Sequence, residues 1–74
     1  MPQFELDNVG PGTFSGLVRG RTVDDAVRRG ASIPADAALT VTSEADLQGW
    51  QEVVMDGEVY GRVRLHQRMR FRRD

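Results

Sequence analysis

The sequence predicts a small α+β domain in which a mostly antiparallel sheet of four or five strands packs on one short helix. Three observations lead to this fold class. The chain has only 74 residues, apolar and polar residues alternate in several short segments, and one segment carries helix-capping signals at both ends. A chain of this length supports one small hydrophobic core. We therefore expect a single domain that spans residues 1–74.

The N-terminal segment predicts a β-hairpin. Residues 4–7 alternate between apolar and polar side chains, residues 9–12 supply Gly and Pro for a turn, and residues 13–19 form a second candidate strand. Two short strands joined by such a turn are expected to pair with each other, which gives the sheet its first two members.

Residues 22–30 predict a helix of about two turns. Thr22 is suited to the N-cap, and Asp25 follows it at the spacing of a capping box. Acidic residues occupy the first turn and arginines the last, at i, i+4 spacing, which suits the helix dipole and allows ion pairs. Gly30 is expected to end the helix in a left-handed conformation.

The remaining chain predicts further strands and a second, very short helix. Asp-Gly between apolar segments is a strong signal for a two-residue hairpin turn. The expected elements are a strand over 38–42, a one-turn helix over 44–48 capped by Ser43, and a hairpin of 50–55 with the segment from 58 onward around Asp56-Gly57. This element order is compatible with a β-grasp-like arrangement or a small roll.

The C-terminal segment 59–72 carries the strongest pattern in the chain. Its odd positions are mostly apolar and its even positions mostly basic, and side chains alternate between the two faces of a strand. The pattern therefore predicts an Arg-rich strand with one apolar and one basic face. The even positions are Tyr60, Arg62, Arg64, His66, Arg68, Arg70 and Arg72.

Charge is unevenly distributed along the chain. Residues 1–61 hold four arginines against ten acids, a net charge of −6, whereas residues 62–74 hold six arginines against one acid, a net charge of +5. The repulsion between the like charges of the Arg-rich strand is tolerable in water, but it favours an acidic neighbour. That neighbour is either an acid of the same chain, such as Glu52 or Asp46, or the surface of a partner.

The length of the Arg-rich strand poses a second question. Thirteen extended residues span about 43 Å, which exceeds the diameter of about 30 Å expected for a compact domain of this size. The chain therefore either bends, near Gly61 or near His66 and Gln67, or residues 67–74 extend as an arm. Such an arm would insert Met69 and Phe71 into a partner's sheet by strand addition.

The hairpin register decides which side chains lie beside the arginines. A two-residue turn pairs Trp50 with Val63 and Val54 with Val59, so these four residues are expected in the core. The same register places Val53, Met55 and Tyr60 on the face of Arg62 and Arg64. A three-residue turn over 56–58 would instead bury Val53 and Met55.

The residues offer little for catalysis, and we do not expect an enzyme. The chain has no Cys and a single His, no serine has the flanking glycines of a nucleophile elbow, and the glycine-rich segment 10–16 lacks the Lys of a phosphate-binding loop. We expect no catalytic residue, no metal site and no cofactor.

The sequence is therefore interpreted as a protein–protein interaction or assembly module that acts through its Arg-rich C-terminal strand. Its partner would be another protein or a second copy, and the chain would form a homo-oligomer. The alternative is a nucleic-acid-binding protein that uses the same arginines, and a lesser one is an accessory subunit of an enzyme. The predicted contact residues are Val53, Met55, Tyr60, Arg62, Arg64, His66, Arg68, Arg70 and Arg72.

The cell compartment is predicted from what the N-terminus lacks. Residues 1–7 have no cationic start and no long apolar segment, so they do not form a signal peptide. Apolar runs are too short to span a membrane. We expect a cytoplasmic protein, and the use of ten Arg without Lys suggests a GC-rich genome and a bacterial or phage accessory protein.

Overall fold

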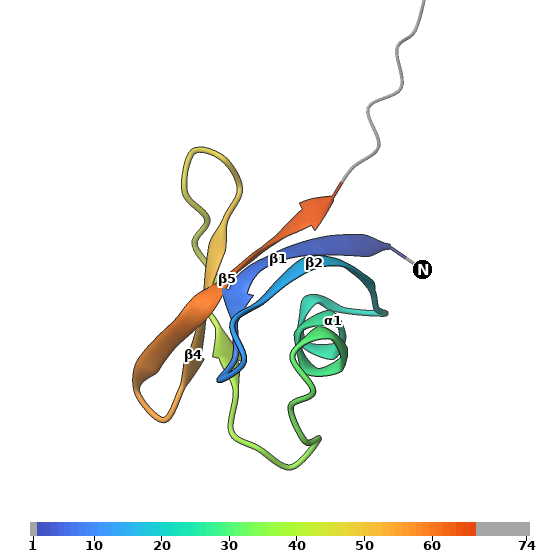
Figure 1. Cartoon of the computed structure of the whole chain (residues 1–74). Coiled ribbons are helices and arrows are strands. Elements are labelled where there is room, and N and C mark those ends of the chain that lie inside the picture. The colour runs from blue at the N-terminus through green and yellow to red at the C-terminus, as the bar shows by residue number, and fades with distance from the viewer. Residues whose placement is uncertain (1, 67–74) are drawn as a thin grey trace, which may run out of the picture.

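The computed structural model of the chain describes residues 2–66 and shows one five-stranded antiparallel sheet with one short helix (Figure 1). The strand order is β2-β1-β5-β4-β3, which makes β5 the central strand. The predicted fold class is confirmed. The elements are β1 (Gln3–Val9), β2 (Phe14–Arg19), α1 (Val23–Gly30), β3 (Thr40–Val41), β4 (Gln51–Met55) and β5 (Glu58–His66).

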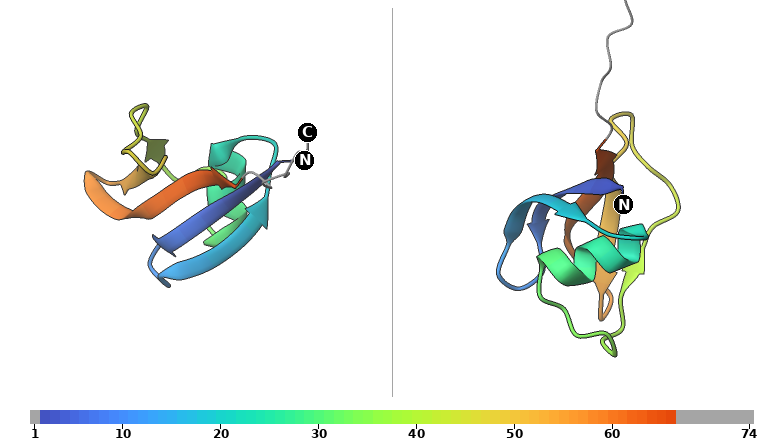
Figure 2. Two further views of the ribbon diagram at one scale, coloured as in Figure 1. Left: turned by 90° about the horizontal axis from the view of Figure 1, so that it is seen from above. Right: turned by 90° about the vertical axis from the view of Figure 1, so that its right-hand side faces the viewer.

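The helix α1 packs on one face of the sheet, against β1 and β2, and leaves the other face without a covering element among residues 2–66 (Figure 2). We call these the inner face and the outer face. Apolar side chains of the inner face, of α1 and of the loop that follows α1 form the core, which consists of Phe4, Leu6, Val9, Ala26, Val27, Ile33, Val53 and Val63. No helix in the described part of the chain is long and apolar enough to cross a membrane.

The predicted N-terminal hairpin and helix are confirmed. β1 and β2 pair antiparallel, and the Thr22 hydroxyl caps α1 by accepting a hydrogen bond of 3.1 Å from the Asp25 N–H. The Asp25 carboxylate in turn accepts from the Arg21 N–H at 2.9 Å. Both predicted i, i+4 ion pairs form along the helix.

The end of α1 differs from the prediction. Gly30 is the last helical residue and is not left-handed; Ser32, at φ +57°, takes that conformation instead. Gly30 is required by packing, because a Cβ there would lie 2.7 Å from Val18 Cγ2 and 2.9 Å from Leu6 Cδ2. The glycine therefore lets the helix approach β1 and β2 closely.

The expected helix over 44–48 is wrong. Residues 43–49 form a loop, because the Asp46 side chain bonds to backbone groups that a helix would have used. Its Oδ1 accepts hydrogen bonds from the N–H groups of Gln48 at 2.8 Å and Trp50 at 2.9 Å. Side chains of this type compete with helix formation in this way. The expected strand over 38–42 shortens to Thr40–Val41.

The hairpin between β4 and β5 begins as predicted and then changes register. The two-residue turn at Asp56-Gly57 pairs Met55 with Glu58, and both turn residues have the positive φ of a type I′ turn. Beyond Val54, however, a bulge places one extra residue on β5, so Gln51 rather than Trp50 lies opposite Val63.

Because of the bulge, several residues lie on the face of the sheet opposite to the one that the sequence predicts. Val53 is completely buried in the core rather than beside the arginines, and Val59 is 57% exposed on the outer face. The change of face occurs at Gly61. Its φ is +97°, and a Cβ at this position would collide with the carbonyl oxygen of Asn8. The predicted bend near Gly61 is thus present, whereas the proposed arm over 67–74 lies outside the described residues.

Candidate functional site

The outer face carries two neighbouring rows of opposite charge. Glu5 and Asp7 alternate with buried residues of β1, and β1 pairs with β5 so that Glu5 lies opposite Arg64 and Asp7 opposite Arg62. Because directly opposed residues share a face of an antiparallel sheet, all four side chains project from the outer face.

Each arginine of β5 forms an ion pair with an acid of β1. Arg62 Nε donates to Asp7 Oδ2 at 2.7 Å, and Arg64 Nε donates to Glu5 Oε1 at 2.9 Å. The four side chains are about one third to one half exposed, so each pair contributes no more than about 1 kcal/mol to stability. The acids that form ion pairs with these arginines therefore lie on β1. Of the two acids that the sequence suggested, Glu52 lies opposite Arg62 on β4, and the charge of Arg62 helps to lower the pKa of Asp46.

Trp50 lies between β4 and the loop 43–49 and is covered by the same two arginines. The Cζ atoms of Arg62 and Arg64 lie 4.4 Å and 4.3 Å from the centroid of its ring, within the range of cation–π interactions worth about 0.5–1 kcal/mol each at exposed sites. The residue is only 8% exposed although it does not belong to the core cluster. We call Arg62, Trp50 and Arg64 the Arg–Trp–Arg cluster.

The loop 43–49 holds Trp50 in this position. Two hydrogen bonds join Asp46 and Trp50, one from the Asp46 N–H to the Trp50 carbonyl and one from the Trp50 N–H to the Asp46 carboxylate. The second of these bonds is the main reason that the pKa of Asp46 lies below its ordinary value, and the N–H of Gln48 and the charge of Arg62 lower it further. Arg64 Nη1 also donates to the Gln48 carbonyl, at 3.3 Å.

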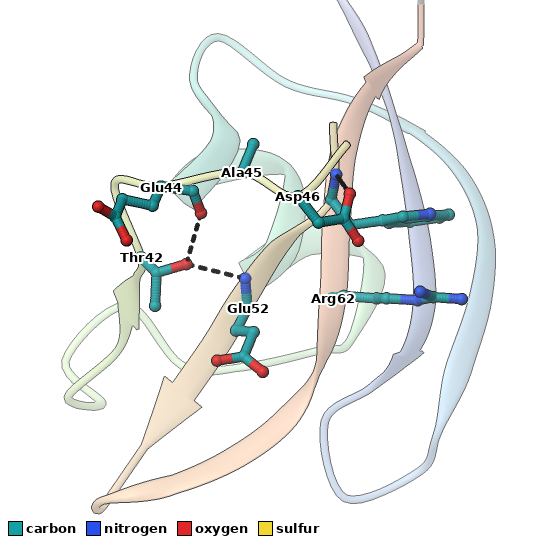
Figure 3. Close-up of a pocket in the computed structure, with 7 residues that line it drawn as sticks. Thr42, Glu44, Ala45, Asp46, Glu52 and Arg62 are labelled. Carbon is teal, nitrogen blue, oxygen red and sulfur yellow. Dashed lines mark hydrogen bonds between the residues drawn. The ribbon is translucent and has the colours of Figure 1, made fainter. Parts of the chain in front are cut away.

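An open cleft of about 400 Å³ lies beside the Arg–Trp–Arg cluster (Figure 3). Thr42 organises one of its walls, because its hydroxyl donates to the Glu44 carbonyl at 3.3 Å and accepts from the Glu52 N–H at 3.0 Å. The lining residues are Thr42, Glu44, Ala45, Asp46, Trp50, Glu52 and Arg62. Among residues 2–66, no group of three or more His, Asp or Glu side chains is arranged to hold a metal ion.

The structure brings only part of the predicted contact set together. Arg62, Arg64 and His66 lie on the outer face of β5, at alternating positions as predicted. Val53 belongs to the core and Met55 packs partly against it, so neither lies beside the arginines. Arg68, Arg70 and Arg72 lie outside the described residues.

Tyr60 lies next to the bulge and is half-buried. Its hydroxyl donates to the Glu58 carboxylate at 3.1 Å, and this hydrogen bond is the main reason that the pKa of Tyr60 is raised above its ordinary value. The side chain is thus engaged with a near neighbour in sequence rather than with the ion-paired arginines.

Sequence reasoning missed the acids of β1 and the position of Trp50. The i, i+2 spacing of Glu5 and Asp7 matches that of Arg62 and Arg64, which is the signal that could have paired the two strands. No protein-family model, no curated protein and no solved structure matches this chain. The site is therefore interpreted from its geometry alone, as a charge-balanced sheet face centred on the Arg–Trp–Arg cluster.

Proposed function

We propose that this chain is a non-enzymatic protein–protein interaction module that docks on its partner through the outer face of the sheet, with β5 at its centre. The observation that supports this most directly is the Arg–Trp–Arg cluster on a sheet face that no other described element covers. Trp and Arg are the residues most often found to dominate binding energy at protein interfaces. We propose that it acts in the cytoplasm of a bacterium or a phage-infected cell.

The cluster is organised before any partner arrives. Each guanidinium is held by a carboxylate of β1 and by the indole ring, which together restrict the rotamers of two long side chains. Ordering such side chains on binding costs about 0.5–1.5 kcal/mol each, so pre-ordering favours association. Exposed apolar side chains on the same face, Leu17 at 51% and Val59 at 57% exposed, add area that a partner can bury.

A protein partner fits this face better than a nucleic acid does. Single-stranded nucleic acids stack their bases on accessible aromatic rings, and the Trp50 ring is covered by the two arginines. Those arginines are already paired with carboxylates. Residues 2–66 hold six arginines against ten acids, a net charge of −4, which opposes phosphate binding.

Site-directed photo-cross-linking in the cells that make the protein tests this proposal. A benzoylphenylalanine replaces Leu17 on the outer face and, as a matched control, the exposed Arg29 on α1 at the opposite side of the domain. We expect protein adducts, identified by mass spectrometry, from position 17 and none from position 29. Equal adducts at both positions, adducts to nucleic acid alone, or none at position 17 would each refute the proposal.

A further inference from the structure

The charge pattern of the outer face is arranged in strips that run across the strands. In one strip the order is Leu17 on β2, Glu5 on β1, Arg64 on β5 and then Trp50, because Leu17 pairs with Glu5, Glu5 pairs with Arg64, and Arg64 lies 4.3 Å from the Trp50 ring. The next strip has Asp7 on β1, Arg62 on β5 and then Glu52 on β4, because Arg62 pairs with both acids. Negative and positive side chains thus occupy adjacent strands of the outer face.

A surface with this order is complementary to itself under a two-fold rotation. Consider an axis that runs parallel to the strands, between β1 and β5, above the outer face. Rotation by half a turn places β1 of one copy over β5 of the other, and the reverse. Glu5 then faces Arg64 of the second copy, and Asp7 faces Arg62, so each contact occurs twice, as in any isologous interface.

The apolar ends of the strip match under the same rotation. β2 of one copy comes to lie over the β4 side of the other, which brings Leu17 against the Arg–Trp–Arg cluster of the second copy. Leu17 is half exposed in the single chain, and its burial there would exclude water from the neighbouring ion pairs. Two sheets packed face to face keep their strand directions within about 30° of each other at a separation of about 10 Å. A two-fold axis parallel to the strands is compatible with this kind of packing.

A second copy matches this face better than a partner of one charge does. An acidic surface would attract the row on β5 and repel the row on β1, and a basic surface would do the reverse. Like-charge juxtaposition at an interface suppresses wrong partners. A partner must therefore carry the same alternation in reverse order, and a copy of this chain related by the two-fold axis carries it.

We propose that the outer face is the interface of a two-fold symmetric homodimer in which the acidic row of each copy faces the arginines of the other. This inference rests on the proposed function, since it names the partner of the same face. It adds that the docking partner is a second copy of this chain and that the contact is held by reciprocal charge pairs flanked by Leu17.

Complementary charge reversal tests the dimer with the full chain. In Glu5→Arg, residue 5 meets Arg64 of the second copy as a like charge, and in Arg64→Glu, residue 64 meets Glu5. Each reversal makes two repulsive contacts, so we expect a dimeric wild-type protein and monomeric single variants by light scattering, with dissociation constants raised by roughly 100-fold or more. An equimolar mixture of the two variants restores opposite charges at both contacts and is expected to dimerise.

Two further variants separate docking from folding. Leu17→Arg changes an exposed side chain and places a positive charge against the partner's arginines, so a folded monomer is expected. Arg29→Glu reverses an exposed charge on α1 and should dimerise as the wild type does. A monomeric wild type, a dimer that survives the reversals, or a mixture that stays monomeric would each overturn the homodimer.

The cross-linking experiment distinguishes this inference from the proposed function. Adducts between position 17 and a second copy of this chain support both. Adducts to a different protein, with a wild type that light scattering finds monomeric, overturn the homodimer and leave the docking function in place. Absence of adducts at position 17 together with a monomeric wild type refutes both.

Discussion

The inner and outer faces of the sheet hold their side chains in place by different means. On the inner face Leu6 and Val63 are almost completely buried in one cluster with Val27 of α1, and full burial of such a side chain stabilises the fold by about 1.5–3 kcal/mol. On the outer face Glu5 and Arg64 remain about one third exposed, and a pair of that kind contributes about 0–1 kcal/mol.

This difference assigns separate tasks to the two faces. Apolar burial has no directional requirement, so the inner face provides most of the stability. Ion pairs and ring contacts require particular distances and angles. The outer face therefore fixes the positions of its charged side chains but adds little to the stability of the fold. β5 contributes to both faces, and the bulge at Gly61 determines which of its residues faces which way.

Substitution of Gly61 is expected to produce the largest loss. A side chain there must occupy a backbone conformation at φ +97° and collide with the carbonyl oxygen of Asn8. Backbone strain of this kind costs about 1–3 kcal/mol, and the collision adds to it. We expect Gly61→Ala to lower the free energy of unfolding by about 3 kcal/mol or more, measured by denaturant titration.

Gly57, in the turn of the same hairpin, provides the matched control. Its φ is +77°, but a Cβ there would meet no atom within 4 Å. Gly57→Ala should therefore cost only the conformational part, about 1–2 kcal/mol. Similar losses for the two variants would show that the close approach of Asn8 does not determine the bulge.

The bulge also explains which parts of the fold the sequence could predict. The hairpins and α1 follow from local signals, such as the Thr22 cap and the Asp56-Gly57 turn, and these were predicted correctly. The faces of Val53 and Val59 depend on the bulge, which depends on contact between Gly61 and a residue of β1 far away in sequence. An isolated Gly within a strand is a signal for such a bulge, but it does not show which residues change face.

The candidate site was predictable to a similar degree. Arg62 and Arg64 share a face because both follow the bulge, so alternation alone identified them. Their partners Glu5 and Asp7 could not be assigned, because the adjacency of β1 and β5 is a property of the whole sheet. Trp50 was predicted to be buried, and it is, but its cover consists of guanidinium groups rather than the core.

Substitution of two valines on β5 allows the stability contributed by the two faces to be compared directly. Val63 is fully buried on the inner face and Val59 is 57% exposed on the outer face. Val63→Ala should lower the free energy of unfolding by about 2 kcal/mol, because it removes buried apolar surface and leaves a cavity. Val59→Ala should change it by less than about 0.5 kcal/mol. Equal losses in denaturant titrations of the two variants would contradict the assigned faces.

The smallest expected effect concerns the loop that positions Trp50, and it depends on pH. The hydrogen bond from the Trp50 N–H to the Asp46 carboxylate is the leading cause that lowers the pKa of Asp46 below its ordinary value of 3.8. A group whose pKa is lower in the folded state stabilises the fold above its unfolded pKa, and this contribution disappears as the pH falls through the folded pKa. Asp46 should therefore stabilise the loop at neutral pH and lose that effect in acid below 3.8.

Asp46→Asn isolates this contribution, because the amide oxygen can still accept the backbone hydrogen bonds but carries no charge. The variant should be slightly less stable than the wild type at neutral pH, and the difference between their free energies of unfolding should shrink as the pH falls below 3.8. The pKa of Asp25 is also lowered, chiefly by the Arg21 N–H, but Asp25 is present in both proteins and cancels in the difference. A difference that stays constant with pH would mean that the charge of Asp46 does not stabilise the loop beneath the Arg–Trp–Arg cluster.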